Sequence, residues 1–233
     1  MRLYIIRHAD PDYENNTITP AGHFEAKALA AHLKNVGLDK IYYSPLGRAI
    51  DTMQYTADLL NIEPQLEEWT EELSHSIELE AWGRMHVCDV PGEVVRNLEP
   101  NDSHEKWHER KIYSEPELME KIKGIWRNSD DFIKRNGYVR EGERFRCIKP
   151  NSDKIAIFCH ANLGMTWLAY LLGIPASIMW SGFWPAPSSV TTVLFEERSQ
   201  NFAVPRCIGF GDVSHLNIQK LPISSRGINA NFY

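Results

Sequence analysis

Short apolar runs that lead into helical segments recur along this chain, and they constrain its fold more than any other feature. The runs are residues 3–6, 41–43 and 155–158, and the helical segments that follow them are residues 20–36, 45–60 and 161–172. Short apolar runs bounded by polar residues predict buried strands, and apolar residues spaced three and four apart predict helices. Strands that alternate with helices predict an α/β fold, here a three-layer α/β/α sandwich around a mostly parallel central sheet.

The first two predicted helices begin at recognisable capping residues. Thr19 is a good N-cap, Pro20 suits the first helical position, and Gly37 is a natural stop after the last turn. By the same logic Ser44 is predicted to cap the second helix, with Pro45 at its first position. Both helices are therefore expected to start directly after a strand or a short loop.

The middle of the chain has a different character. Residues 74–150 are polar, rich in Trp, His and Glu and poor in strand signals, and the apolar spacing predicts one helix over residues 115–135. We interpret residues 1–233 as a single domain with a helical insertion at about 74–150, which covers one edge of the core. Residues 188–198 and 202–212 are expected to form a β-hairpin at an edge of the sheet.

Composition excludes several classes of protein. A hydrophobic share of 43% with 24% charged residues is typical of a globular chain and not of a disordered one. No run of about 18 apolar residues predicts a membrane span, and the apolar start is interpreted as a first strand and not as a signal peptide. The net charge of -6 does not favour a nucleic-acid partner. The four cysteines form no CxxC pair, so we expect reduced thiols in a cytoplasmic protein.

Arginine and histidine side chains gather at the ends of the predicted strands. Arg7 and His8 follow the first strand, Arg48 lies in the first turn of the helix after the second, and His160 follows a later strand. In α/β sheets ligands bind outside the carboxyl ends of the strands, so these four residues are expected to form one cationic cup. Arginine matches phosphate oxygens, and neutral histidine can act as a nucleophile at pH 7. The pattern predicts phosphoryl transfer through a phosphohistidine.

Three motifs around these residues resemble one known family. "RHA" at residues 7–9, "SPLGRA" at 44–49 and "CHA" at 159–161 look like the histidine phosphatase superfamily, which has the phosphoglycerate mutase-like fold. The resemblance covers about residues 1–73 and 153–210. It implies that His8 is the catalytic nucleophile and that Arg7, Arg48 and His160 bind the phosphate.

The family also uses a carboxylic acid that protonates the leaving oxygen. The resemblance places this acid in "EEWTEEL" at residues 67–73, at Glu72, with Glu71 as the alternative. The chain departs from the usual family pattern at Ala9, where glycine is common, and its late motif continues to Asn162, which either adds a donor to the pocket or caps the helix there. The segment after "RHA" matches the mutase branch poorly, which favours a hydrolase.

Other features give weaker signals. His104 and His108 stand four residues apart but lack the glutamate of an HExxH motif, so no metal site is predicted. The Trp-rich stretch at residues 179–190 is expected to pack between a helix and a strand. His215 is left without a role, and Asp10 is expected either to shape the loop after the first strand or to orient His8.

The combined interpretation is a phosphatase that needs no metal or other cofactor and hydrolyses a phosphomonoester through phospho-His8. The alternatives are a phosphoglycerate-type mutase and a phospho-ligand binding protein with weak turnover. The expected partner is a phosphorylated small molecule or phosphopeptide, with no nucleic acid and no membrane. The substrate and the oligomeric state are left open by the sequence.

Overall fold

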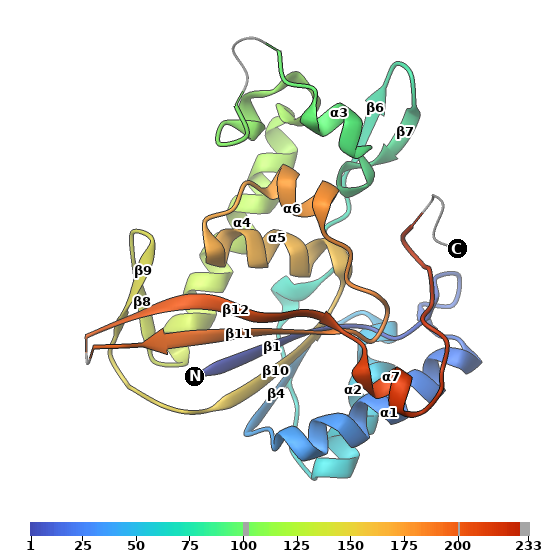
Figure 1. The fold of residues 1–233 in the computed structure, drawn as a ribbon, viewed down its shortest axis with the longest axis vertical. Coiled ribbons are helices and arrows are strands. Elements are labelled where there is room, and N and C mark those ends of the chain that lie inside the picture. Colours follow the sequence, from blue (N-terminus) through green and yellow to red (C-terminus); the bar gives the residue numbers. More distant parts are fainter. Residues whose placement is uncertain (100–102, 200, 229–233) are drawn as a thin grey trace.

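A mixed eight-stranded sheet forms the centre of the protein in the computed structural model, which describes residues 1–99, 103–199 and 201–228 (Figure 1). In spatial order its strands are β5 (Gln65–Leu66), β4 (Lys40–Tyr43), β10 (Lys154–Cys159), β1 (Arg2–Arg7), β11 (Val190–Glu197), β12 (Phe202–Asp212), β9 (Arg144–Cys147) and β8 (Tyr138–Glu141). The first four are parallel to one another, and the last four continue the sheet by antiparallel pairing. The α/β class and the parallel core of the sheet are confirmed.

Helices cover both faces of this sheet, because successive side chains of its central strand point to opposite sides. Tyr4 and Ile6 belong to a core shared with α1 and α2, whereas Leu3 and Ile5 belong to a larger core shared with α4 and α5. Figure 1 shows α1 and α2 below the sheet and α4, α5 and α6 above it. The helices are α1 (Pro20–Val36), α2 (Gly47–Leu60), α3 (Gly92–Arg96), α4 (Pro116–Arg135), α5 (Ala161–Leu172), α6 (Ala176–Gly182) and α7 (Ser214–Ile218).

Helix α1 begins and ends as its sequence predicts. The hydroxyl oxygen of Thr19 accepts a hydrogen bond from the Gly22 amide at 3.0 Å, and Pro20 is the first residue of the helix. Gly37 closes it with a φ of 71°, a left-handed conformation that glycine adopts without steric cost.

The predicted start of the second helix is wrong. Helix α2 begins at Gly47, its N-cap position is Leu46, and no side chain caps it. The hydroxyl of Ser44 is instead hydrogen-bonded to the Nε2 atom of His160 at 2.8 Å. A tertiary partner thus holds the side chain that local pattern assigns to the helix end.

Residues 74–150 contain strands as well as helices. Their upper part, which Figure 1 shows projecting above the sheet, holds the hairpin of β6 (Ser76–Leu79) and β7 (Gly83–His86) and the short helix α3. Strand β9 then pairs with β12 and β8 pairs with β9, so the two extend the main sheet. The predicted hairpin of β11 and β12 is confirmed, but β12 is not an edge strand, because β9 and β8 lie beyond it.

The remaining elements are short. Strands β2 (Pro11–Asp12) and β3 (Thr17–Ile18) form a small ladder after β1, and the 3-10 turns are η1 (Glu68–Thr70), η2 (Val87–Asp89), η3 (Trp107–Glu109) and η4 (Lys111–Tyr113). Trp180, from the Trp-rich stretch, packs against Trp107 of η3 at a ring-centroid distance of 5.2 Å, and Phe183 of the same stretch packs against Phe210 of β12, also at 5.2 Å. No helix in the described ranges is long and apolar enough to cross a membrane.

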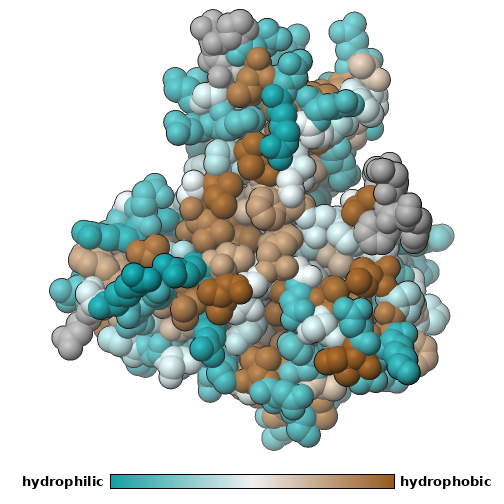
Figure 2. Space-filling view, in the orientation of Figure 1, coloured by the Kyte–Doolittle hydropathy of each residue, from teal (hydrophilic) through white to brown (hydrophobic). Residues whose placement is uncertain are grey.

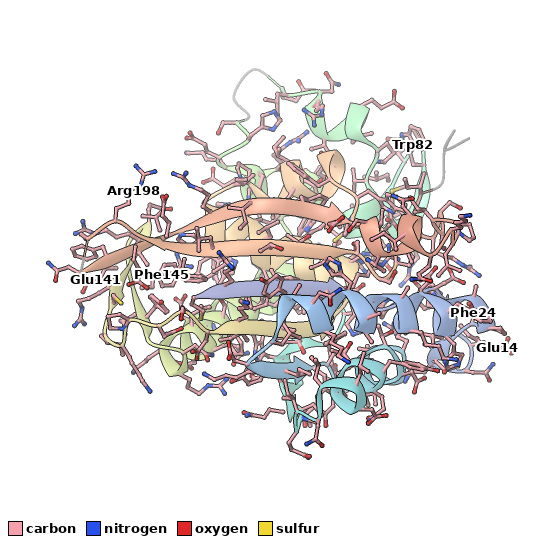
Figure 3. The ribbon with its side chains drawn as sticks, turned by 60° about the horizontal axis from the view of Figure 1, so that its bottom comes forward. Glu14, Phe24, Trp82, Glu141, Phe145 and Arg198 are labelled. Carbon is pink, nitrogen blue, oxygen red and sulfur yellow. The ribbon has the colours of Figure 1, made fainter. Side chains whose placement is uncertain are left out.

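The two ends of the sheet differ. Figure 3 shows Glu14, in the loop after β1, at one end, and Glu141 and Arg198, at the tips of the antiparallel strands, at the other. Figure 2 shows apolar residues gathered across the middle of one face, over α5, α6 and β12, where Val204 and Ile208 are half exposed. Because β1, β4 and β10 are parallel, their carboxyl ends meet at one end of the sheet, the end marked by Glu14 in Figure 3. The four cationic residues are expected there.

Two helical glycines, one in a crowded place on α1 and one in an open place on α4, are predicted to respond oppositely to substitution by alanine. A Cβ atom on Gly22 would lie 2.5 Å from the Asp10 carbonyl oxygen, so Gly22→Ala is expected to lower the free energy of unfolding, by about 1–3 kcal/mol. On α4 a Cβ atom on Gly124 would meet only the end of the Arg127 side chain, at 3.9 Å. Gly124→Ala is therefore expected to raise the free energy of unfolding, by about 0.5–1 kcal/mol. Urea denaturation of both variants measures the pair, and equal signs would contradict the packing argument.

Candidate active site

Strand β1 carries Arg7 and His8 to the carboxyl edge of the sheet and holds them in a buried position. It pairs with β10 on one side and β11 on the other, and the His8 amide donates to the Cys159 carbonyl at 2.9 Å. Only 5% of Arg7 and 1% of His8 is exposed. A side chain mounted on a strand that is paired on both sides has little freedom to move.

The His8 ring is neutral, and its proton has a defined place. Burial lowers its pKa well below the ordinary value of 6.5, and the charges of Arg7 and Arg48 lower it further. Nδ1 lies 2.8 Å from the carbonyl oxygen of Ala9, which can only accept, so Nδ1 carries the hydrogen. The lone pair is therefore on Nε2, as a nucleophilic imidazole requires.

His160 lies beside His8 at the end of the neighbouring strand. The two ring centroids are 5.2 Å apart, and burial, His8 and Arg48 together hold the pKa of His160 well below 6.5. Ser44 lies against its Nε2 atom at 2.8 Å, whereas the buried Nδ1 atom has no hydrogen-bond partner among the described residues. When the Ser44 hydroxyl donates to Nε2, the ring hydrogen is on Nδ1 and is available to a ligand.

Arg48 reaches the same place from the first turn of α2. One Nη1 hydrogen bond, of 3.0 Å, goes to the Oδ1 atom of Asn16, and the Tyr13 ring lies 5.4 Å from its guanidinium carbon. The loop that holds Asn16 comes so close to the helix that a Cβ atom on Gly47 would lie 2.2 Å from the Asn16 carbonyl oxygen. Glycine before Arg48 thus permits the contact that orients the guanidinium.

Arg7 is fixed from the opposite side by carbonyl oxygens. Its Nη1 atom donates to Pro185 at 2.8 Å and to Arg226 at 3.1 Å. Its Nε atom, like that of Arg48, is buried and has no hydrogen-bond partner in the described part of the chain. With His160 Nδ1 these atoms make three buried nitrogens without a partner around His8, an arrangement that is costly in a folded protein. An anion with several oxygen atoms would satisfy all three.

Glu72 completes the cluster, and Glu71 does not. The Glu72 Oε1 atom accepts from the Leu163 amide at 2.9 Å and Oε2 from the Asn162 amide at 3.4 Å, so the carboxylate also caps α5. Burial raises its pKa above 4.5, although the Leu163 amide and the charge of Arg7 oppose this. The side chain of Glu71 is exposed.

Asn162 does not cap α5, so that expectation is wrong. His160 is at the N-cap position, Asn162 is the second residue of the helix, and its side-chain amide lies 3.3 Å from the Nδ1 atom of His86. His86, at the end of β7, is a site neighbour that the sequence did not reveal, because 76 residues separate it from Asn162. The sequence signal that could have pointed to His86 was a histidine in an otherwise polar region.

The loop after His8 is shaped by Asp10. Its carboxylate accepts from the hydroxyls of Thr19 at 2.8 Å and Ser224 at 2.5 Å, so its contacts are with the loop. Ala9 is fully buried, and its amide donates to the Thr52 hydroxyl at 2.9 Å. In the described ranges no group of three or more His, Cys, Asp or Glu side chains could hold a metal ion. His104 and His108 therefore do not belong to such a group.

The sequence is similar to a known family and to individual proteins. The model of the histidine phosphatase superfamily (branch 1) matches residues 3–206. A 2,3-bisphosphoglycerate-dependent phosphoglycerate mutase of Thermoplasma acidophilum is 36% identical over 67 residues, 24% of this chain and 34% of that protein. A putative phosphoserine phosphatase 2 of Hydrogenobacter thermophilus is 32% identical over 82 residues, 31% of this chain and 40% of that protein. The chain thus spans roughly a third to two fifths of the length of these relatives.

Solved structures share the fold over most of the chain. A phosphoserine phosphatase from Entamoeba histolytica, in complex with 3-phosphoglyceric acid, has a TM-score of 0.60 at 21% identity and covers 92% of this chain and 98% of its own. A mycobacterial glucosyl-3-phosphoglycerate phosphatase with inorganic phosphate has a TM-score of 0.60 at 16% identity, with 92% and 98% covered. At this identity the likeness establishes the architecture.

An anion site at the unpartnered nitrogens predicts stabilisation by inorganic phosphate. At ten times the dissociation constant, phosphate is expected to add about 1.4 kcal/mol to the free energy of unfolding, a rise in melting temperature of roughly 3–5 °C. Arg48→Ala should abolish this rise, and Arg84→Ala, which changes an exposed arginine of β7, should keep it. Calorimetry with and without phosphate measures both, and a full rise in the Arg48 variant would place the anion elsewhere.

Proposed function

This chain belongs to the histidine phosphatase superfamily (branch 1), and on that premise we propose that it hydrolyses a phosphomonoester through a phosphohistidine on His8. The observation that carries the proposal is the set of three buried nitrogens, at Arg7, Arg48 and His160, that have no partner among the described residues and belong to side chains around a neutral imidazole. They supply donors for the non-bridging oxygens of a phosphoryl group, and His8 Nε2 supplies the electron pair.

In the first half-reaction His8 Nε2 attacks phosphorus in line with the ester oxygen. The N–P bond forms, the P–O bond to the leaving group breaks, and Glu72 gives its proton to the leaving oxygen. Arg7 and Arg48 balance the charge of the equatorial oxygens, as a phosphoryl-transfer transition state requires. The raised pKa of Glu72 supports its role as the acid, because a larger fraction of the carboxyl groups is protonated near neutral pH.

In the second half-reaction the Glu72 carboxylate takes a proton from water, and the oxygen attacks phosphorus. The N–P bond breaks, inorganic phosphate leaves, and His8 and Glu72 return to their starting protonation states. Both half-reactions use the same five side chains: Arg7, His8, Arg48, Glu72 and His160.

The region at 74–150 is proposed to determine which phosphorylated small molecule or phosphopeptide enters. It contributes His86, which lies 3.3 Å from the amide of Asn162 in the first turn of α5, next to His160. The solved relatives act on phosphoserine and on a glucosyl phosphoglycerate, which supports a small phosphorylated metabolite as substrate. Four unpaired cysteines support the proposed cytoplasmic setting.

A mutase is the second candidate, favoured by the 36% identity to a phosphoglycerate mutase over 67 residues. It would pass the phosphoryl group from His8 to a second hydroxyl of the substrate instead of to water. Interconversion of 2- and 3-phosphoglycerate without phosphate release would establish the mutase. Phosphate binding without turnover on either test would establish the third candidate, a binding protein.

Removal of the nucleophile is the direct test of the mechanism. His8→Ala is expected to lower kcat with a phosphomonoester by at least about 10³-fold, because the other imidazole of the site, His160, has its Nε2 atom hydrogen-bonded to Ser44 and its ring hydrogen on Nδ1, which leaves it no free lone pair. Rapid quench with a ³²P-labelled substrate should trap an acid-labile, alkali-stable label on the wild type only. His108→Ala, which changes an exposed histidine, is the matched control. Wild-type turnover in the His8 variant would sink the proposal.

A paired glutamate substitution tests the acid. Glu72→Gln is expected to lower kcat by about 10²–10⁴-fold, whereas Glu71→Gln should stay within about twofold, since that side chain is exposed. Because the acid must be protonated and its pKa is raised, the wild-type rate should fall as pH rises through that pKa, and Glu72→Gln should lose this limb. Rates of phosphate release from pH 5 to 9 measure the effect, and the reverse ranking of the variants would move the role to Glu71.

A further inference from the structure

A buried glutamate that takes no part in the chemistry lies directly beneath the loop after His8. Glu25, on α1, is 4% exposed, and its Oε2 atom accepts a hydrogen bond from the Asp10 amide at 2.9 Å. Asp10 is the second residue after His8, so this bond restrains the chain on the far side of the nucleophile from β1. Burial of a carboxylate costs free energy unless hydrogen bonds compensate for the lost water.

A second segment reaches the same carboxylate. Ser188, just before β11, donates its amide to the His8 carbonyl oxygen at 3.0 Å, and its side chain lowers the pKa of the Glu25 carboxyl. Its hydroxyl also lies 3.2 Å from the Nε2 atom of His215. The φ of Ser188 is 58°, a left-handed conformation that is uncommon for any residue with a side chain. Backbone strain of this kind persists where surrounding contacts demand it.

The direction of each hydrogen bond follows from the donors available. An ionised Glu25 can only accept, so a Ser188 hydroxyl that donates to Glu25 must itself accept the Nε2 hydrogen of His215. If Glu25 is protonated, its hydrogen can go to the Ser188 oxygen, and the Ser188 hydrogen can then go to Nε2 of the neutral His215 ring. Both states satisfy these groups, but only the ionised carboxylate makes a charge-assisted hydrogen bond with the Asp10 amide, which is the stronger kind.

We propose that Glu25 is a positioning residue, whose ionised carboxylate holds His8 in place through the Asp10 amide on one side and through Ser188 on the other. The effect on catalysis rests on the proposed phosphatase function, but the hold on the loop does not. Glu25 touches neither the phosphate nor the leaving group in this scheme, and it acts only on the main chain that carries the nucleophile.

Charges around Glu25 set the pH range of this hold. Burial, the largest cause, raises the pKa of Glu25 to about 7; the carboxylate of Asp10 raises it and the charge of Arg7 lowers it. On the other packed elements, Arg226 lies 3.9 Å from Asp10, and the neutral ring of His215 lies 5.9 Å from that of His32. Glu25 therefore ionises near neutral pH, and the hold should strengthen as pH rises through about 7.

Stability should change in the opposite direction. The folded-state pKa of about 7 exceeds the ordinary value of 4.5, so the folded state binds the proton more tightly than the unfolded state. The contribution of Glu25 to stability is then present at low pH and is lost as pH rises towards about 7. The melting temperature of Glu25→Gln should accordingly exceed that of the wild type at pH 8.5, and the difference should shrink at pH 5.

The first test follows the loop itself and needs no activity. In ¹H–¹⁵N spectra recorded from pH 5 to 9, the Asp10 amide resonance of the wild type is expected to titrate with a midpoint near 7. The titration should vanish in Glu25→Gln, which keeps a carbonyl acceptor, and should persist in Glu63→Gln, which changes an exposed glutamate. Ser188→Gly keeps the left-handed backbone but removes a donor, and should move the midpoint upward. A wild-type Asp10 amide that does not titrate overturns the proposal.

The second test reads the same network through catalysis. The wild-type rate of phosphate release should fall below about pH 7 with the midpoint of the Asp10 amide. Glu25→Gln, which mimics the protonated carboxyl, should lose this acid limb and keep the lower rate of the acid form at every pH, whereas Glu25→Ala should lose about tenfold in kcat with KM within twofold. The second ionisation of the substrate, near pH 6, is common to all variants. An unchanged limb in Glu25→Gln contradicts the positioning role. A wild type that lacks turnover while its Asp10 amide titrates refutes the phosphatase and leaves the hold on the loop supported.

Discussion

The parallel pairing of β1 with β10 is the constraint on which the candidate site depends. Its register places Arg7 opposite Cys159, so the next residues along each strand, His8 and His160, emerge side by side at the sheet edge. The distance of 5.2 Å between their rings is a consequence of that register. A slip by one residue would turn each side chain of β1 to the other face and would separate the pair.

Burial at this edge keeps the two histidines neutral, but it also removes polar nitrogen atoms from water. Two imidazoles and two guanidiniums in close contact would repel one another if all were charged, but burial holds both histidines neutral. The arginines remain charged, and each has a buried Nε atom without a partner in the described residues. The free protein therefore holds a binding site at some expense of stability, which is common where function requires unsatisfied groups. The Glu25 network below the loop has the same character, since its ionised form is less stable than its protonated form.

Local sequence pattern was sufficient for strands β1, β4, β10, β11 and β12, for α1 and for the placement of Arg7, His8, Arg48 and His160. Each of these follows from a few consecutive residues and from the rule that parallel strands share a carboxyl edge. Long-range partners could not be predicted in this way. Ser44 has a good local pattern for a helix cap, yet its hydroxyl is hydrogen-bonded to His160, which lies 116 residues further along the chain. The amide of Asn162 likewise lies against His86, and β8 and β9 join the sheet although their sequence has weak strand signals.

The order of the strands has a consequence for how the protein assembles. Strand β1 holds the proposed nucleophile, but its two neighbours, β10 and β11, are formed by residues 154–197. Pairings of such long sequence separation form late, because the loop that joins them must close first. During synthesis β1 would wait, unpaired, until the residues of β10, Lys154–Cys159, had been made. The edge that carries the candidate site therefore forms late, and a chain that stops before β10 carries His8 without the rest of the site around it.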